Sequence, residues 1–158
     1  MLDVDPALFR QLLGRFATGV TVISVVAEDG RPHGMTANSL ASVSLSPPLI
    51  SVCIDHRAEM HAVITKAAMF VVNILGQHQE GLSRRFADPH DDRFDGVGYQ
   101  LSQDGNLLLD GAIAHIECRR EAMCEAGDHT IVIGRVVGGS TSEGRPLLYF
   151  RGGYAALA

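Results

Sequence analysis

The chain has 158 residues, of which 46% are hydrophobic and 20% charged, and its formal net charge is −5. The length suits one folded domain, and the composition excludes a disordered chain. The acidic balance argues against a nucleic-acid-binding protein, and no apolar run is long enough to span a membrane.

The N-terminal segment and the cysteines indicate a cellular compartment. Residues 1–6 are acidic and lack the basic start and apolar segment of a signal peptide. Cys53, Cys118 and Cys124 are an odd number of cysteines without CxxC spacing. We therefore expect free thiols and a cytoplasmic protein.

The first half of the chain predicts short helices between strands. Asp5 and Pro6 are typical of a helix start, and large apolar residues then recur at helical spacing as far as Phe16. β-branched runs bounded by turn residues predict strands. The predicted elements are a helix from residue 6 onwards, strands at 20–26, 34–45 and 49–54, a helix at 59–67, a strand at 69–74 and a helix at 77–86.

The second half predicts longer strands. Residues 87–98 are rich in Asp, Gly and Pro and are interpreted as a surface loop. Strands are expected at 112–123, 129–138 and 147–150. Because strands do not alternate regularly with helices, the fold class is mainly β, a closed or partly closed antiparallel barrel with short helices outside. We see no domain boundary, so residues 1–158 are predicted to form a single domain.

Residues 34–49 form a stretch of small side chains between two predicted strands. Its hydroxyl and amide groups supply donors and acceptors without bulk, and its alanines and Val43 add a thin apolar wall. Pro47 and Pro48 lack backbone donors, so the chain must turn out of any central sheet here. The stretch suits a groove for a flat ligand. A polar edge strand and loop that bind nothing explain the same composition.

Several familiar site patterns are absent from the sequence. There is no dinucleotide fingerprint, no phosphate-binding Walker loop and no Gly-x-Ser-x-Gly. His56 and His61, with Glu59 between them, do not match the spacing of a zinc-binding helix, so we interpret both as surface histidines and predict no metal. His129 follows Gly127 and Asp128 in a turn between two long strands. It is either an ordinary turn residue or a rim histidine that donates a hydrogen bond to a ligand.

Taken together, the sequence resembles the flavin reductase family, which has the FMN-binding split-barrel fold and includes the short reductase components of two-component flavin monooxygenases. The resemblance depends on several short sequence pieces: together they are specific for the family, although any one of them alone would be weak evidence. The matching pieces are residues 15–23, 34–39, 42–49, 70–75, 82–87, 127–129, 146–150 and 153–154.

The resemblance implies a fold, an activity and partners. The fold would be a Greek-key split β-barrel, and the activity would be reduction of FMN or FAD by NADH or NADPH. Reduced flavin would pass to a separate flavin-dependent monooxygenase, and two chains would form a homodimer with the site near their interface. The alternatives are a flavin- or haem-binding split barrel without reductase turnover and a flavoprotein that reduces another acceptor.

The resemblance also implies a role for each matching residue. The isoalloxazine and ribityl chain would be lined by Thr36, Ala37, Asn38, Ser39, Ser42, Val43 and Ser44, with Cys53, Ile54 and Asp55 along the flavin. The flavin phosphate would meet Arg57, Ala58, Glu59 and Met60, with Arg85 and Phe86 closing that side. The nicotinamide would be positioned by His129, the residue expected to have a catalytic role, and the second nucleotide would be held by Arg151, Gly152, Gly153 and Tyr154.

One position departs from the family pattern. Family members often carry a serine where this chain has Ala58. Loss of a hydroxyl–phosphate hydrogen bond weakens binding by about 1 kcal/mol. The departure affects the phosphate contacts rather than the fold, and Arg57, Arg84 or Arg85 would take over part of the role.

Overall fold

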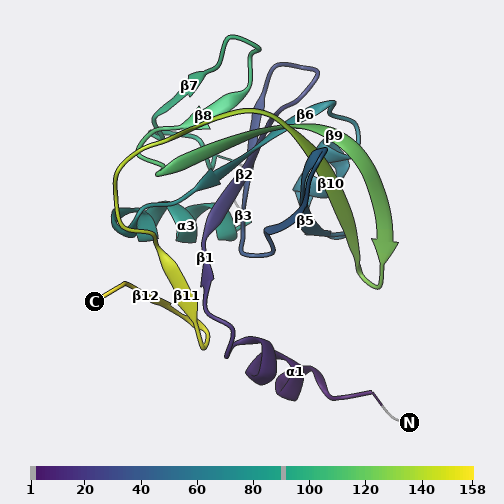
Figure 1. The fold of residues 1–158 in the computed structure, drawn as a ribbon, viewed down its shortest axis with the longest axis vertical. Coiled ribbons are helices and arrows are strands. Elements are labelled where there is room, and N and C mark those ends of the chain that lie inside the picture. The colour runs from purple at the N-terminus through teal and green to yellow at the C-terminus, as the bar shows by residue number, and fades with distance from the viewer. Residues whose placement is uncertain (1–2, 90–91) are drawn as a thin grey trace.

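A strongly curved antiparallel sheet forms most of the molecule (Figure 1). The computed structural model describes residues 3–89 and 92–158. Seven strands pair in the order β3-β2-β6-β9-β10-β5-β4. Their bounds are β2 Thr21–Val26, β3 Pro32–Ala37, β4 Ala41–Leu45, β5 Pro48–Asp55, β6 Met69–Ile74, β9 Ala114–Ala126 and β10 His129–Thr141.

The connection between β3 and β4 explains why this sheet curls. The two strands lie at opposite edges of the sheet, yet only residues 38–40 separate them in the chain. An extended link of that length spans at most about 14 Å. The two edges must therefore approach each other, which gives the partly closed barrel expected from the sequence.

Two smaller sheets extend the barrel. The strands β1 Thr18–Gly19, β11 Leu148–Phe150 and β12 Gly153–Ala155 form one sheet, and β7 Tyr99–Leu101 pairs with β8 Leu107–Leu109. Arg151 and Gly152 connect β11 to β12 with φ values of 52° and 79°. Two positive φ values are typical of the tight turns that join antiparallel strands.

The described residues contain three α-helices, of which α2 Glu59–Ile64 packs against the apolar cluster inside the curved sheet. α1 Pro6–Leu13 projects from the barrel as an arm (Figure 1), and the Asp5 carboxylate accepts hydrogen bonds from the first turn of this helix. α2 buries Met60 and Ile64, and α3 Glu80–Ala87 buries Ser83 and Phe86 after a short 3₁₀ turn, η1 Gln77–Gln79. Among the described residues, no helix is both long and apolar enough to cross a lipid bilayer.

Two apolar clusters hold these layers together. Ile23, Ile54 and Phe70 belong to the cluster inside the curved sheet, while Leu75 and Phe86 belong to a second cluster beside α3. Gly134 sits where a Cβ atom would lie 2.5 Å from the Phe70 ring, so the absence of a side chain lets β10 approach this ring. Each large side chain contributes about 1.5–3 kcal/mol on burial.

The predicted elements match the structure except at their boundaries and in short segments. The first helix ends at Leu13, before Phe16, and the helix expected at 59–67 ends at Ile64. The predicted strand 34–45 is wrong as one element, because β3 ends at Ala37 and the chain crosses to the other edge of the sheet. Strands β1, β7, β8 and β12 were not predicted. Residues 90–91 of the expected loop lie outside the described residues.

Candidate functional site

The end of β3 forms the first wall of a surface hollow. The Thr36 hydroxyl donates to the carbonyl oxygen of Ser83 on α3 at 2.6 Å, and the Ala37 side chain is buried. Asn38 follows with an exposed side chain. These residues line a hollow of about 220 Å³ together with Val20, Ser83, Ala87, Tyr149 and Tyr154. Small side chains on β3 leave room for the flat face of a ligand.

Tyr154 connects the C-terminal hairpin to this hollow. Its hydroxyl lies 2.7 Å from the Ser83 hydroxyl, and the Arg84 guanidinium lies over its ring at 4.8 Å. Arg151 and Gly152 occupy the turn of the same hairpin instead, where the Arg151 amide donates to the Gly14 carbonyl. Of the four C-terminal residues expected to hold a nucleotide, Tyr154 alone lines this hollow.

Ser39 ties the corner after β3 to the neighbouring strand. The Cys53 amide donates to the Ser39 hydroxyl at 3.0 Å, and this hydroxyl donates back to the Cys53 carbonyl at 3.3 Å. Ile54 points the other way, into the core. Ser39 therefore fixes the backbone of the groove, a role that the sequence did not indicate.

The strand β4 supplies an exposed wall. It is an edge strand with an irregular register between Ser42 and Ser44, and Val43 lies largely exposed between them. Backbone groups along an edge strand lack a neighbour within the sheet. Ser42 and Val43 therefore present exposed side chains on this surface, and the outward backbone groups of β4 have no neighbouring strand within the described sheet.

A tight ion pair shapes the turn after β5. The Asp55 carboxylate accepts from the Arg57 amide at 2.8 Å and from its guanidinium at 3.0 Å. These bonds hold the pKa of Asp55 well below its usual range and raise the pKa of Arg57. Ala58 then occupies the N-cap position of α2, where no side chain caps the helix. Arg57, which is paired with Asp55 and largely exposed, is one of the residues that line a second hollow.

The second hollow has a volume of about 360 Å³ and contains a buried donor. Its lining residues are Met35, Arg57, Ala58, Glu59, Met60, Phe86, Ala87, Pro89 and Arg93. Arg93 Nε is buried and has no hydrogen-bond partner among residues 3–89 and 92–158. Arg57 already pairs with Asp55 and Glu59 adds a carboxylate to the lining, so the group that favours an anion here is Arg93, whose buried Nε has no partner among the described residues. Ala87 lines both hollows, so they adjoin.

Arg85 and Phe86 act through the neighbouring loop. The Arg85 guanidinium donates to the carbonyl oxygens of Asp92, Arg93 and Asp95, while the Phe86 ring packs edge-on against Phe94 at 4.9 Å. Arg85 thereby holds the loop that carries Arg93 instead of lining the hollow itself. Sequence patterns did not reveal Arg93, because it lies in an irregular segment.

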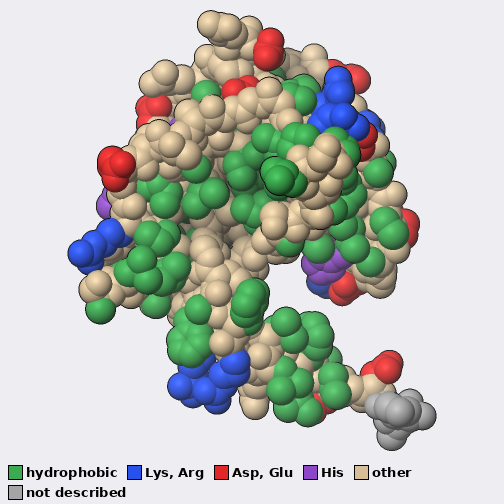
Figure 2. All heavy atoms as spheres, in the orientation of Figure 1, with side chains coloured by type: hydrophobic (Ala, Val, Ile, Leu, Met, Phe, Trp, Pro, Cys, Tyr) green, Lys and Arg blue, Asp and Glu red, His purple; other side chains and the backbone are tan. Residues whose placement is uncertain are grey.

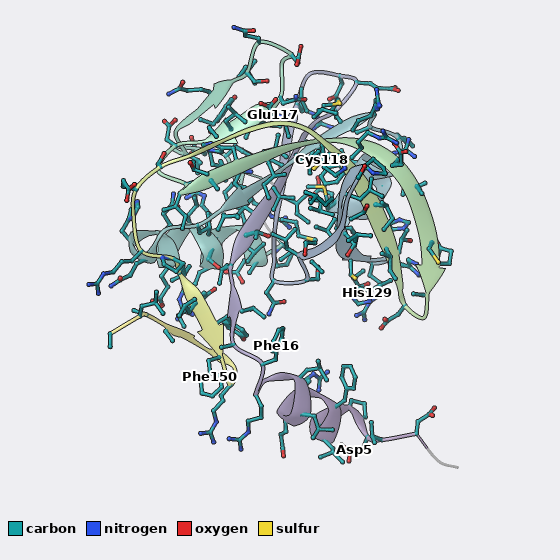
Figure 3. All side chains as sticks on the ribbon, viewed as in Figure 1. Asp5, Phe16, Glu117, Cys118, His129 and Phe150 are labelled. Carbon is teal, nitrogen blue, oxygen red and sulfur yellow. The ribbon has the colours of Figure 1, made fainter. Side chains whose placement is uncertain are left out.

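His129 lies at the tip of the long β9–β10 hairpin (Figure 3). It pairs with Asp55 in register, and its Nδ1 lies 2.7 Å from the Asp128 carboxylate. This contact lowers the pKa of Asp128. The ring is partly exposed and is oriented by a carboxylate, so its Nε2 is available to a ligand.

Figure 2 shows open space between the hairpin tip and the α1 arm, beneath the barrel. Green apolar side chains border this space on the arm. The tip of the β9–β10 hairpin, where His129 lies, therefore faces open space on this side (Figure 3).

Comparison with known proteins assigns the chain to a family. A protein-family model described as "Flavin reductase like domain" matches residues 13–158 of this chain. The chain belongs to the flavin reductase family. Curated relatives of similar length support this membership. A protein named "Flavin reductase" from Pseudomonas putida is 40% identical over 156 residues, covering 98% of this chain and 92% of that protein.

Solved flavin reductases share the fold over nearly the whole chain. The Streptomyces globisporus C-1027 NADH:FAD oxidoreductase in complex with NAD and FAD fragments has a TM-score of 0.92 and 40% identity, covering 100% of this chain and 98% of that one. The styrene monooxygenase flavin reductase from Pseudomonas putida S12 has a TM-score of 0.88 and 37% identity, covering 95% and 97%. The fold and the family resemblance expected from the sequence are confirmed.

Proposed function

We propose that this protein is an NADH-dependent flavin reductase that reduces FMN or FAD and releases the reduced flavin to a separate monooxygenase. The observation that carries the proposal is full-length similarity to a flavin reductase solved with NAD and FAD fragments. A monooxygenase partner is supported by the styrene monooxygenase flavin reductase among the structural relatives. A cytoplasmic location is supported by the three free thiols.

The two adjoining hollows fit the two ends of a flavin. The isoalloxazine would lie against Ala37 and Asn38, where small side chains expose the backbone. The phosphate would lie near Arg57 and Arg93, whose buried Nε has no partner among the described residues. A bound flavin supplies the redox chemistry by accepting hydride from the nicotinamide. Residues of this chain then bind, orient and enclose the two cofactors.

His129 is the residue that we assign to the nicotinamide. Its Nδ1–H donates to the Asp128 carboxylate, so the neutral ring presents Nε2 as an acceptor for the N–H of the nicotinamide carboxamide. Hydride transfer between cofactors requires no proton transfer from the protein. The role proposed for His129 is therefore positioning.

The proposed active form is a homodimer. α1 buries none of its residues, although Leu8, Phe9, Leu12 and Leu13 are large apolar side chains. An isolated helix of eight residues is unstable in water, so this arm requires a packing partner. A second chain would bury the apolar face of α1 and cover the open side of the site.

Steady-state NADH oxidation tests the proposed activity. We expect turnover that depends on added FMN or FAD and saturates with each, because the flavin is a dissociable substrate. Flavin binding without NADH oxidation would indicate a binding protein instead. NADH oxidation that needs another acceptor but no added flavin would indicate a flavoprotein with a different acceptor.

A further inference from the structure

A cluster of metal-binding side chains lies beside α2, outside the proposed flavin groove. His56, His61 and Glu125 each offer a ligand atom, and these atoms lie within 4.8 Å of one another. His56 follows β5, His61 belongs to α2, and Glu125 belongs to β9. Glu125 is distant in sequence from the two histidines, so the spacing of His56 and His61 alone did not reveal the cluster.

We propose that these three side chains bind a divalent transition-metal ion, with Zn²⁺ as the best match. Two imidazoles and one carboxylate are a common zinc ligand set, and a fourth position would remain for water. Bonds of about 2.0–2.2 Å to a tetrahedral ion place the ligand atoms about 3.4 Å apart, so side chains whose ligand atoms now lie within 4.8 Å must move closer together to bind it. The exposed His56 side chain allows this movement.

The surrounding hydrogen bonds prepare the ligands. The buried Thr130 hydroxyl donates to Glu125 Oε1 at 2.8 Å, so it accepts its 2.9 Å hydrogen bond from His61 Nε2. His61 then keeps an unprotonated second nitrogen, the form that binds metals. His56 Nε2 lies 2.8 Å from Glu125 Oε2 and completes the arrangement.

The cluster lies on the opposite face of the sheet from His129. Successive residues of a strand point to opposite faces, so Thr130 and the adjacent His129 diverge. Thr130 pairs with Ile54 and contacts α2, whereas His129 pairs with Asp55. A bound Zn²⁺ would therefore connect the turn after β5 to α2 and β9 without touching the nicotinamide position. Arg57 and Ala58 continue directly from His56, so the metal would stabilise the turn beside the second hollow.

Calorimetric titration of the full chain with Zn²⁺ tests this inference. Tag-free protein treated with a chelator should bind one equivalent per chain, and its thermal midpoint should rise because the ion binds the folded state. Glu125→Gln and His56→Ala should each weaken Zn²⁺ by roughly tenfold or more, and Thr130→Val by about tenfold. Glu125→Gln keeps the acceptor for Thr130, so it separates metal ligation from folding.

Two matched controls exclude other sources of zinc binding. His78→Ala removes an exposed histidine elsewhere, and Cys124→Ser removes the exposed thiol adjacent to Glu125. Both should keep the parent affinity. FMN titration should give the same dissociation constant for parent and Glu125→Gln, showing an intact fold. Absence of saturable Zn²⁺ binding, or equal binding by parent, His56→Ala and Glu125→Gln, would show a hydrogen-bonded cluster without a metal.

Discussion

Ala37 occupies the position where the smallness of a side chain matters most to the proposed site. It lies at the end of β3 and lines the first hollow. Ala37→Leu would place three additional carbon atoms in the space assigned to the isoalloxazine. We expect FMN affinity to fall by roughly tenfold or more, about 1.4 kcal/mol, while the protein remains folded. Flavin titration with circular dichroism as a folding control measures this. An unchanged FMN dissociation constant in a folded variant would show that the isoalloxazine does not bind beside Ala37.

A substitution at Ala58 could change both the stability of α2 and the affinity for the flavin phosphate. It is the N-cap residue of α2 without a side-chain cap, and it lines the second hollow. Ala58→Ser should add about 0.5–2 kcal/mol of stability if its hydroxyl caps the helix. It should also tighten FMN by about a few-fold if the hydroxyl reaches the phosphate.

Riboflavin, which lacks the phosphate, separates the two effects of Ala58→Ser. Tighter FMN with unchanged riboflavin assigns residue 58 to the phosphate. Equal tightening of both ligands would place this residue away from the phosphate.

His129→Ala tests the position assigned to the nicotinamide. Loss of the imidazole should lower kcat/KM for NADH by roughly tenfold or more, equivalent to about 1.4 kcal/mol of transition-state binding. FMN affinity should stay close to that of the parent, because the ring is not assigned to the flavin. Stopped-flow reduction of the flavin-loaded variant over a range of NADH concentrations provides the measurement. An unchanged reduction rate would show that His129 does not position the nicotinamide and is an ordinary turn residue.

At the scale of elements, Gly134 on β10 leaves space for the Phe70 ring, which reaches it from β6 across β9. A Cβ atom there would lie 2.5 Å from the Phe70 ring and 2.9 Å from Cys118 Cβ. Gly134→Ala should therefore lower the free energy of unfolding by about 1–3 kcal/mol. The matched control is Gly81→Ala in α3, where the added methyl group meets nothing within 4 Å and alanine favours the helix by up to about 1 kcal/mol. Urea unfolding should give opposite signs for the two variants.

The sequence predicted most of the sheet because its strands have strong local signals. Runs of β-branched residues such as 20–26 and 69–74 are buried over nearly their whole length, so pattern and structure agree. β1 and β12 have only two and three residues, and their pairing depends on contacts distant in sequence. The break after Ala37 was missed because small residues continue through the corner without a change of pattern.

Some of the residues that the resemblance assigns to the flavin lie together in the structure. Thr36, Ala37 and Tyr154 meet in one hollow, and residues 57–60 line the next. Ser83 and Arg93 were absent from the predicted set because their roles depend on where α3 and the following loop pack against β3. The hydrogen bonds that occupy Ser39 and Arg85 likewise arise only in the folded chain.

At the scale of the whole molecule, the α1 arm has no buried residue among the part of the chain that the structure describes. Leu12 is 56% exposed and Phe16 is 74% exposed. Light scattering should give the mass of a dimer at micromolar concentration. Leu12→Glu combined with Phe16→Glu should shift the mass to that of a monomer and reduce NADH oxidation, because each chain loses the cover over its site. Gln11→Glu, which adds charge on a polar residue of the same helix, should remain dimeric. A parent monomer with full activity would contradict the proposed dimer.

The position of Tyr154 has an optical consequence. The chain has three tyrosines and no tryptophan, so its ultraviolet emission is tyrosine fluorescence. Two of the three emitters, Tyr149 and Tyr154, line the hollow assigned to the isoalloxazine. Flavins absorb in the range where tyrosine emits, and energy transfer is efficient at such short range. The protein thus carries a built-in reporter of flavin occupancy, and binding can be followed by the quenching of its own emission without any label.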